Sequence, residues 1–414
     1  MTKQTAKQVP VKIEIISPLH IGDGQRLNPF VDIVQDKNLV YVLDHSLLMK
    51  KAEESDLFYK TLMSAYTESR EDTKHVKMKN LLNFFKIRFK DATLPSGSGR
   101  YIISSCPLSA KDGVNCFIKT VDNRVYIPGS SLKGSIRSLL LQNEVFQEVN
   151  DYQKIMERAL KSPKPPDRKH ADNQIEAVFF GKDHHHDFLR ILQIADSQPK
   201  EAQALRIREI QILSCTNNGL MPKKWVINAE TIEPGQSFET TITFNHHLLS
   251  NRLAANELKF SETRVAQVTK FIEHCRETSN RFIQKEISFY GKYKQKPLVD
   301  RYEKLARQPL EDNQCLVHVG WGTGFDSKTV TNFFDDKMVE TIRRRYGLGK
   351  FIYKHRGCGG LVRKDKPCTK CNRSNLQRND IEKIMINPLP KTRKVCIESN
   401  RPAKPLGWVK LTLG

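Results

Sequence analysis

The chain reads Pro128-Gly129-Ser130-Ser131-Leu132-Lys133-Gly134 over residues 128–134, and this stretch decides the interpretation of the sequence. A strand-like segment from Val114 to Tyr126 leads into it. Behind it, apolar residues recur on one helical face from Leu132 to Leu140. The pattern predicts a strand, a glycine loop and a helix, in that order.

A glycine loop that opens a helix suits a phosphate oxygen, because it presents backbone N–H groups at the positive end of the helix dipole. Ser130 and Ser131 can cap the helix or donate hydrogen bonds, and Arg137 lies one turn beyond Lys133. A nucleotide-binding P-loop is excluded, because its lysine follows the second glycine and here Lys133 precedes Gly134. A capped helix whose glycines serve only tight packing is the alternative.

Composition favours a polyanionic partner for this chain of 414 residues with a formal charge of +22. Nucleic acid is the first candidate. A membrane surface is the rival, but the sequence shows no lipidation motif and no basic amphipathic arm. No stretch approaches the roughly 18 apolar residues of a membrane span, and the start lacks a signal-peptide layout, so we expect a cytoplasmic protein.

The amino-terminal half begins with alternating apolar residues from Val9 to Ile15, which predict a half-buried strand. A turn at residues 19–24 follows, and Leu39 to Leu43 is expected to be a second short strand. Asp44 is placed to begin a helical stretch that runs with breaks to about Phe89. We expect loops at 93–100 and 161–170, and further strands at 101–105, 189–194 and 205–213.

A second domain is expected to start near Asn217-Asn218-Gly219, where residues 225–244 look like paired strands around Pro234-Gly235. Residues 247–307 are mostly helical in pattern, and strands are expected again at 316–319, 395–397 and 408–413. Each half therefore holds strands, helices and a glycine-rich turn after a strand. We predict two α+β domains, covering residues 1–216 and 217–414.

The second glycine-rich turn reads Gly320-Trp321-Gly322-Thr323-Gly324, and Ser327 and Lys328 follow it closely. A flexible backbone with a hydroxyl and a lysine can follow a sugar-phosphate chain. A glycine-rich hairpin without a ligand is the alternative. Trp321 can stack on a base, although a tryptophan more often packs in a core.

The spacing of His355 and Cys358, followed by Cys368 and Cys371, predicts a structural zinc site, because two such knuckles complete a tetrahedral shell. We place this site in an insertion at about residues 352–378. Nine cysteines in total, three of them clustered here, favour thiols over structural disulfides. Residues 343–378 also contain twelve Lys or Arg and a single acid, Asp365, a density typical of phosphate contacts.

Other candidates for chemistry lack visible partners. His20, beside Gly22 and Gly24, could act as acid or base in RNA cleavage, and Asp32 could hold a metal. Three consecutive histidines, 184–186, do not easily converge on one ion, so we expect them to be solvent-exposed. We therefore predict no catalytic residue in this chain.

The order of motifs resembles that of the RAMP superfamily of CRISPR proteins, and within it the Csm-type (type III-A) subunit that caps the 3′ end of the guide RNA. Ser17 to Gly24 resembles the amino-terminal signature, and Ile127 to Arg137 the most specific motif. Ile194-Ala195-Asp196-Ser197, residues 320–330 and Pro405 to Val409 follow in the expected places. The resemblance covers essentially the whole chain.

The resemblance implies ferredoxin-like, RRM-like domains, assembly beside a repeating backbone subunit, contact with guide RNA (crRNA) and a part in crRNA maturation for antiviral defence. It implies no catalytic centre, and trimming nucleases of the host become further candidate partners. The zinc knuckles are not general to the family, and residues 28–31 do not match the loop in which backbone subunits carry a cutting aspartate. A metal-independent endoribonuclease that processes crRNA is the alternative. The implied RNA contacts are His20, Gly22, Gly24, Gly129, Ser130, Ser131, Lys133, Gly134, Arg137, Gly322, Gly324, Ser327 and Lys328.

Overall fold

The computed structural model describes the residues 7–36, 39–68, 78–87, 101–102, 113–162, 166–167, 170–201, 204–216, 219–245, 248, 251–258, 262–363, 366–386, 389–399 and 401–414. The loop expected at 93–100 lies outside these residues, as do most of the strand expected at 101–105 and part of the loop expected at 161–170.

One large sheet has five antiparallel strands and joins the two ends of the chain. Its order is β11 (Gln314–His318), β17 (Trp408–Leu413), β1 (Lys7–Ile15), β10 (Ser237–Phe244) and β7 (Leu192–Ile194). In β1 the alternate residues from Val9 to Ile15 are buried, which confirms the predicted half-buried strand. Residues 189–191, expected to be strand, instead belong to the short 3-10 helix η3 (Phe188–Ile191).

A second large sheet has six strands, of which β6 and β9 are parallel neighbours and the other pairs are antiparallel. Its order is β16 (Arg401–Lys404), β15 (Thr392–Glu398), β8 (Leu205–Thr216), β9 (Gly219–Ile232), β6 (Val114–Phe117) and β2 (Gly22–Leu27). The segment expected to be one strand from 114 to 126 is regular only over β6.

The expected pairing around Pro234-Gly235 is wrong. β9 and β10, which flank this turn, lie in different sheets, so the turn carries the chain from one sheet to the other. β9 pairs instead with β8, and the predicted boundary at residue 216 falls at the tip of that hairpin, where Thr216 faces Gly219. Both large sheets take strands from both halves of the chain, so a division at residue 216 does not separate them.

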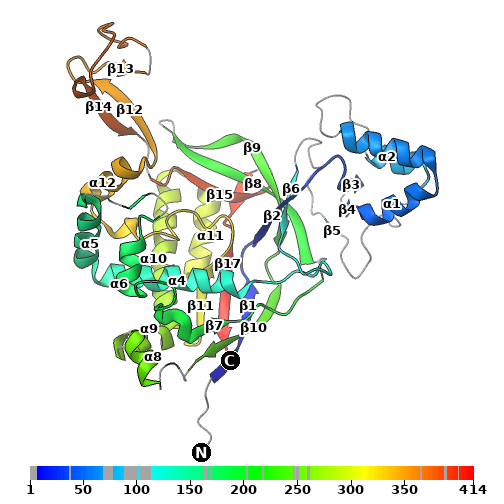
Figure 1. Cartoon of the computed structure of the whole chain (residues 1–414), viewed down its shortest axis with the longest axis horizontal. Coiled ribbons are helices and arrows are strands. Elements are labelled where there is room, and N and C mark those ends of the chain that lie inside the picture. Colours follow the sequence, from blue (N-terminus) through cyan, green and yellow to red (C-terminus); the bar gives the residue numbers. More distant parts are fainter. Residues whose placement is uncertain are drawn as a thin grey trace, which may run out of the picture.

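Helices cover the sheets (Figure 1). Most of them contribute to one main hydrophobic core, while α11 and the second half of α10 pack in a second core with Trp408. The central helices are α4 (Gly129–Gln147), α10 (Phe271–Lys292) and α11 (Lys296–Ala306), and α10 packs against both of the others and against β11. Around them lie α5 (Val149–Lys161), α6 (Asn173–Phe179), α8 (Arg252–Glu257), α9 (Glu262–Thr269) and α12 (Asp336–Tyr346). The helical pattern predicted for residues 247–307 is confirmed.

Two small modules project from this body (Figure 1). One combines the sheet of β3 (Ile33–Asp36), β4 (Leu39–Val42) and β5 (Tyr101–Ile102) with α1 (His45–Glu53), α2 (Asp56–Glu68) and α3 (Met78–Phe84), and it has a core of its own. As predicted, Asp44 caps α1, and its side chain accepts a hydrogen bond from Leu47 N at 3.1 Å. The other is the sheet of β12 (Lys350–His355), β13 (Leu361–Val362) and β14 (Ile381–Ile386).

The chain is thus a mixed α/β protein. Among the helices in the described ranges, none combines the length and the apolar character that a bilayer span requires.

Candidate nucleic-acid interface

The first glycine motif is not a separate loop, because α4 begins at Gly129 directly after Pro128. A Cβ on Gly129 would overlap the carbonyl oxygen of Ile194 and lie 2.7 Å from that of Ala195. The amide N–H of Gly129 donates to Asp196 Oδ1 at 2.8 Å. Gly129 is therefore a packing glycine, and its N–H, which we had expected to face a phosphate, already has a carboxylate partner.

The outer face of the first two turns of α4 carries Ser130, Lys133, Gly134 and Arg137, at the spacing of one helical stripe. Ser130 and Gly134 are exposed, and Ser131 beside them is half-buried. Nothing lies within 4 Å of the place that a Cβ on Gly134 would occupy, so another backbone can approach the helix there. Partial burial lowers the pKa of Lys133, although Asp187 opposes that shift.

The guanidinium of Arg137 is paired with two carboxylates of the same chain. It donates to Asp187 and, at 3.0 Å, to Glu176, and it lies 3.4 Å from the centroid of the Phe180 ring. Two carboxylates offset its charge, so it fixes α4 against α6 and the residues that follow α6.

His20 is buried, with 2% of its surface exposed, and it contacts the glycine-rich turn from Gly320 to Gly324. Its Nδ1 lies 2.7 Å from the carbonyl oxygen of Glu230, and its ring meets Trp321 edge-on at 5.6 Å. Burial lowers the pKa of His20. Gly22 and Gly24 just beyond it are exposed, and Gly24 has a φ of 87° that favours glycine.

The turn from Gly320 to Gly324 packs directly on His20. Trp321 N donates to the carbonyl oxygen of His20 at 2.8 Å, and a Cβ on Gly320 would overlap that same oxygen. The three glycines of this turn have φ values of 80°, 100° and 80°. Here, in contrast to α4, glycine is required by the backbone conformation itself.

The same segment also reaches α4. Lys328 Nζ donates to Ser135 Oγ at 3.2 Å, and Gln142 Nε2 donates to the carbonyl oxygens of Asp326 and Thr329 at 3.2 and 3.1 Å. Residues 320–329 therefore touch both the His20 motif and the α4 motif. Ser327 is buried and donates to Thr323 O at 2.9 Å, so its hydroxyl holds the turn.

A buried ion cluster anchors the end of this turn. Arg393 donates to Asp326 Oδ2 at 3.0 Å and to Glu286 Oε1 at 2.9 Å, and Lys285 Nζ lies 2.9 Å from Asp326 Oδ2. Glu286 and Asp326 are 1% and 3% exposed. Removing one member would leave an uncompensated charge in the interior, so the cluster fixes where Lys328 is presented.

A groove of about 590 Å³ runs along the meeting line of β2, β6 and the second turn. It is lined by His20, Ile21, Gly22, Gly24, Gln25, Arg26, Asn115, Cys116, Gly320 and Trp321. Arg26 is exposed at its wall, and Lys394 Nζ lies 4.7 Å from the centroid of the Trp321 ring. Burial lowers the pKa of Lys328, which contacts Ser135 of α4, and of Lys394, which lies beside Trp321. Among the described residues neither forms an ion pair, so an anion next to either lysine would stabilise its charged form.

Sequence reasoning missed Arg26 and Lys394. Arg26 lies two residues after Gly24, so its position next to the amino-terminal motif could have predicted an RNA contact. Lys394 lies just before the strand expected at 395–397, inside the longer observed strand β15, and its contact with Trp321 joins two segments that are far apart in the sequence.

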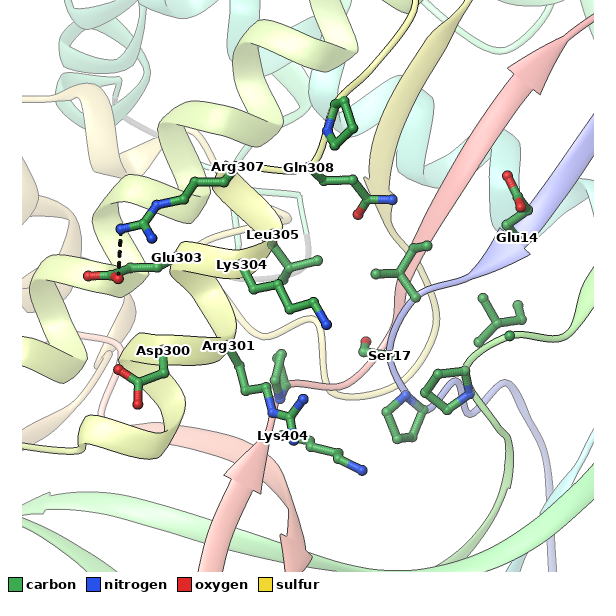
Figure 2. Close-up of a pocket in the computed structure, with 17 residues that line it drawn as sticks. Glu14, Ser17, Asp300, Arg301, Glu303, Lys304, Leu305, Arg307, Gln308 and Lys404 are labelled. Carbon is green, nitrogen blue, oxygen red and sulfur yellow. Dashed lines mark hydrogen bonds and ion pairs between the residues drawn. The ribbon is translucent and has the colours of Figure 1, made fainter.

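A larger cavity of about 920 Å³ lies elsewhere, between α11, the end of β1 and the turn at Pro234 (Figure 2). Three of its cations already have carboxylate partners. Arg307 pairs with Glu303 at 3.1 Å, and Arg301 and Lys404 both pair with Glu398. It is therefore less suited to a polyanion than the groove.

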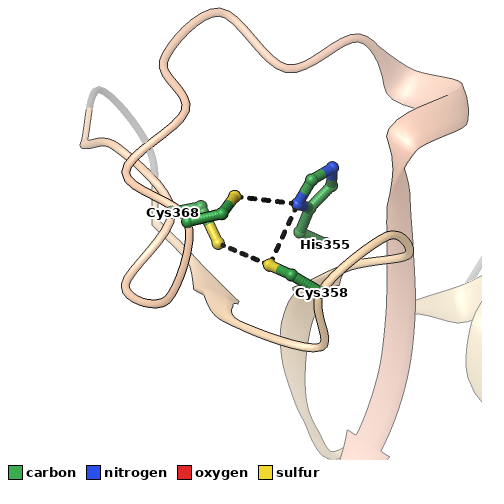
Figure 3. A group of neighbouring side chains, drawn as sticks. His355, Cys358 and Cys368 are labelled. Atoms are coloured by element: carbon green, nitrogen blue, oxygen red, sulfur yellow. Dashed lines mark hydrogen bonds between the residues drawn. The ribbon is translucent and has the colours of Figure 1, made fainter.

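The four predicted metal ligands converge, as Figure 3 shows for His355, Cys358 and Cys368. His355 Nδ1 lies 3.1 Å from Cys358 Sγ and 3.2 Å from Cys371 Sγ, and Cys358 Sγ lies 3.4 Å from Cys368 Sγ. Ligands held about 2.0 to 2.3 Å from a zinc ion are roughly 3.5 Å apart, so this donor set fits one tetrahedral ion. N–H groups of Cys371 and Lys370 lower the pKa of Cys368 to about 6, which favours the metal-binding thiolate.

The remaining candidates do not form metal sites. Asp32 accepts from His45 Nε2 at 2.9 Å and from Asn28 N at 2.6 Å, so both its oxygens serve its own module. In the histidine run, His186 contacts Asp183 and Glu257, and His184 and His185 are exposed as predicted. Among the described residues, the cluster around His355 is the one group of this kind that could hold an ion.

The fold and the site together define an α/β protein with two large sheets, in which glycine-rich segments from three distant parts of the chain meet along one surface. Residues 12–325 match the model of the RAMP superfamily. The chain belongs to this superfamily.

Two relatives of this chain within the superfamily carry the same name. The chain is 25% identical over 411 residues to "CRISPR system Cms protein Csm5" of Methanocaldococcus jannaschii, with 97% of this chain and 88% of that protein covered. It is 26% identical over 244 residues to the protein of the same name from Streptococcus thermophilus, with 55% of this chain and 61% of that protein covered.

Solved structures share the fold. A chain in the cryo-EM structure of a type III-A Csm–crRNA–target RNA ternary complex matches with a TM-score of 0.66 and 21% identity, covering 98% of this chain and 100% of that one. The crystal structure of T. onnurineus Csm5 matches with a TM-score of 0.63 and 20% identity, covering 96% and 99%.

Proposed function

We propose that this chain is a crRNA-binding subunit of a type III-A CRISPR (Csm) effector complex, located at the 3′ end of the guide and involved in its maturation. One observation carries the proposal. The His20–Gly24, Gly129–Arg137 and Gly320–Lys328 segments, far apart in sequence, meet on one surface that presents lysines without carboxylate partners. The relatives named Csm5 and the neighbour in a Csm–crRNA complex support it.

We assign two roles to the candidate RNA-binding residues. Some are accessible and would follow the sugar-phosphate chain: Gly22, Gly24, Ser130, Ser131, Lys133, Gly134, Gly322, Gly324 and Lys328. The others hold these in place, namely His20, Gly129, Arg137 and Ser327. Arg26 and Lys394 join the first group because they flank the groove. A grip of this kind contacts phosphates and carries little base specificity.

The finer architecture is part of the same proposal. We interpret the two large sheets with their helices as two ferredoxin-like, RRM-like units, and residues 352–378 as a zinc-knuckle insertion. A zinc ion held by His355, Cys358, Cys368 and Cys371 would be structural, because four protein ligands leave no open position. Elemental analysis should find about one zinc per chain, lost on Cys368→Ser with Cys371→Ser. Zinc that is absent from native protein contradicts this part.

We propose that the chain has no nuclease activity of its own. His20, the residue of the alternative endoribonuclease, is 2% exposed and lies between the rings of Phe117 and Trp321, with its Nδ1 engaged by a carbonyl oxygen. Purified chain should leave repeat RNA intact. Cleavage by the wild type that disappears in His20→Ala would establish the alternative. If the chain has no nuclease activity, as we propose, crRNA maturation is carried out by trimming nucleases of the host, which are recruited in the cytoplasm.

The test of the function is to purify the chain with its complex and sequence the bound RNA. The proposal predicts short, repeat-derived RNA together with the other Csm-type subunits, above all the repeating backbone subunit. RNA of random origin, or none, contradicts it.

A further inference from the structure

The zinc-knuckle module, comprising β12 to β14 and the two knuckles, carries an excess of positive charge that the guide-binding proposal does not use. Residues 350–386 contain ten Lys or Arg and three Asp or Glu. The module projects from the body beyond α12, so little of its surface is covered by the rest of the chain (Figure 1).

The exposed cations that the structure describes in this module have no carboxylate partner among the described residues. Five described side chains, Arg356, Arg363, Lys366, Lys370 and Arg373, are exposed, and none of them forms an ion pair with a described residue. In the body, by contrast, Arg137, Arg208 and Arg393 are each paired with one or two carboxylates. Because these positive charges are not offset by described carboxylates, the module should attract a polyanion.

An aromatic ring accompanies this charge. Tyr353 is 46% exposed in β12, and Lys383 is its direct partner in β14. Phe351 lies two residues before Tyr353 and so shares its face, where Lys383 Nζ lies 3.9 Å from the Phe351 ring centroid. One sheet face therefore presents an open tyrosine ring beside a lysine, the combination on which single-stranded RNA stacks.

The class of partner follows from this combination. Protein–protein interfaces are depleted in lysine, which makes a protein partner less suited to the face. Duplex RNA is recognised by its shape and backbone and does not require an exposed ring. Single-stranded RNA uses both the ring and the cations.

We propose that the zinc-knuckle module is a second RNA-binding surface, on which Tyr353 stacks on a base of a single strand while Lys383, Arg356 and Lys370 contact its phosphates. The surface is separate from the glycine-lined groove, so it goes beyond the grip on the guide. It selects single strands over duplexes and has little sequence preference.

The experiment measures the affinity of the full chain for an oligouridine of about 16 nucleotides, the upper site size of single-strand-binding modules. All variants are made in a Lys133→Glu background to reduce RNA binding at the start of α4. Because stacking contributes about 1–3 kcal/mol per base, Tyr353→Ala should weaken binding about 5- to 150-fold. Tyr353→Phe keeps the ring and should stay within about twofold of its parent.

Charge is tested separately, since each lost phosphate contact lowers the slope of log affinity against log salt by about 0.7. Arg356→Glu and Lys370→Glu should each show that loss. Zinc content is measured for every variant, and one with normal zinc has kept the module folded. Guide content, quantified in the otherwise wild-type chain carrying Tyr353→Ala, should be unchanged, which separates this inference from the guide-binding proposal.

Equal oligouridine affinity of Tyr353→Ala and its parent overturns the inference. So does a result in which RNA affinity is unchanged while Tyr353→Ala strips a protein subunit from the purified complex, because the face would then be a protein-docking surface.

Discussion

The two glycine-rich segments look alike in the sequence and differ in the folded chain. In the segment that opens α4, Gly129 has ordinary helical geometry and is needed because the backbone of Ile194 leaves no room for a side chain. In the turn from Gly320 to Gly324, the three glycines have positive φ, and the loop shape itself requires them. One segment is a tightly packed helix start and the other is a true loop.

The difference teaches that glycine content does not by itself define a phosphate-binding loop. The first amide N–H of α4, that of Gly129, donates to Asp196 and is not available to a phosphate. RNA can therefore reach only the outer face of the helix, which carries Lys133 and Gly134. The second segment contributes a lysine, Lys328, held over α4 through Ser135. The two segments thus form one surface by different means.

The largest effect is expected at Gly320. Gly320→Ala forces a Cβ onto the carbonyl oxygen of His20 and keeps a positive φ, so it should lower the free energy of unfolding by about 3 kcal/mol or more. Gly324→Ala is the matched control, because it has the same φ of 80° but its nearest neighbour lies 3.9 Å away. It should cost about 1 kcal/mol, which urea denaturation would measure. Equal losses would show that packing on His20 contributes nothing.

At the start of α4 the expected loss is smaller, because Gly129 has no backbone strain to add. Gly129→Ala overlaps Ile194 O and should cost about 2 kcal/mol in the same denaturation experiment. Asp196→Asn tests the other half of the contact, since its amide oxygen can still accept from Gly129 N; it should cost less than Gly129→Ala. A larger loss for Asp196→Asn contradicts the packing role of Gly129.

Acid is expected to weaken the second segment. Burial lowers the pKa of His318 to about 3, and its Nε2 lies 2.8 Å from the carbonyl oxygen of Leu406, next to Gly322. The unfolded chain takes up a proton near its ordinary pKa of about 6.5 and the folded chain does not, so stability falls below that pH by ~1.4 kcal/mol per pH unit.

Unfolding in urea at pH 7 and pH 5.5 measures this loss, before most carboxylates titrate. His318→Gln keeps a donor for Leu406 and should remove much of the difference. A wild type that is equally stable at both pH values contradicts the buried neutral histidine.

Local features were predicted from the sequence better than distant ones. The alternation from Val9 to Ile15 and the capping of α1 by Asp44 are confirmed, since both depend on neighbouring residues. The convergence of the four candidate ligands in the zinc-knuckle module could be predicted because all four lie within 17 consecutive residues, 355–371. The partners of Arg137, 39 and 50 residues away, carried no such signal.

Sheet pairing was the main failure. β9 and β10 flank a good turn sequence, Pro234-Gly235, yet each pairs along most of its length with another strand, β9 with β8 and β10 with β1. The extra ladder and its buried side chains outweigh a single hairpin turn. The meeting of the glycine segments depends on this pairing, which is why single motifs could be identified while their contacts could not.

The smallest effect on stability is expected at Gly134 and has the opposite sign. This glycine is inside α4 with nothing near it, so Gly134→Ala should stabilise the chain by about 0.5–1 kcal/mol. Guide RNA affinity should fall all the same, because the added methyl group stands where the RNA backbone approaches. A variant that is more stable and binds the guide normally would make Gly134 a neutral surface residue.

The central claim is that the start of α4 grips guide RNA through Lys133. The direct measurement is guide affinity of the full chain across a range of salt concentrations, for the wild type, Lys133→Glu and Lys161→Glu. Lys161 is the control, because its side chain is 78% exposed at the far end of α5. We predict at least a tenfold loss for Lys133→Glu with a salt slope lower by about 0.7, and neither change for Lys161→Glu. Guide binding by Lys133→Glu that matches the wild type in affinity and slope would contradict the claim and leave the motif as helix packing alone.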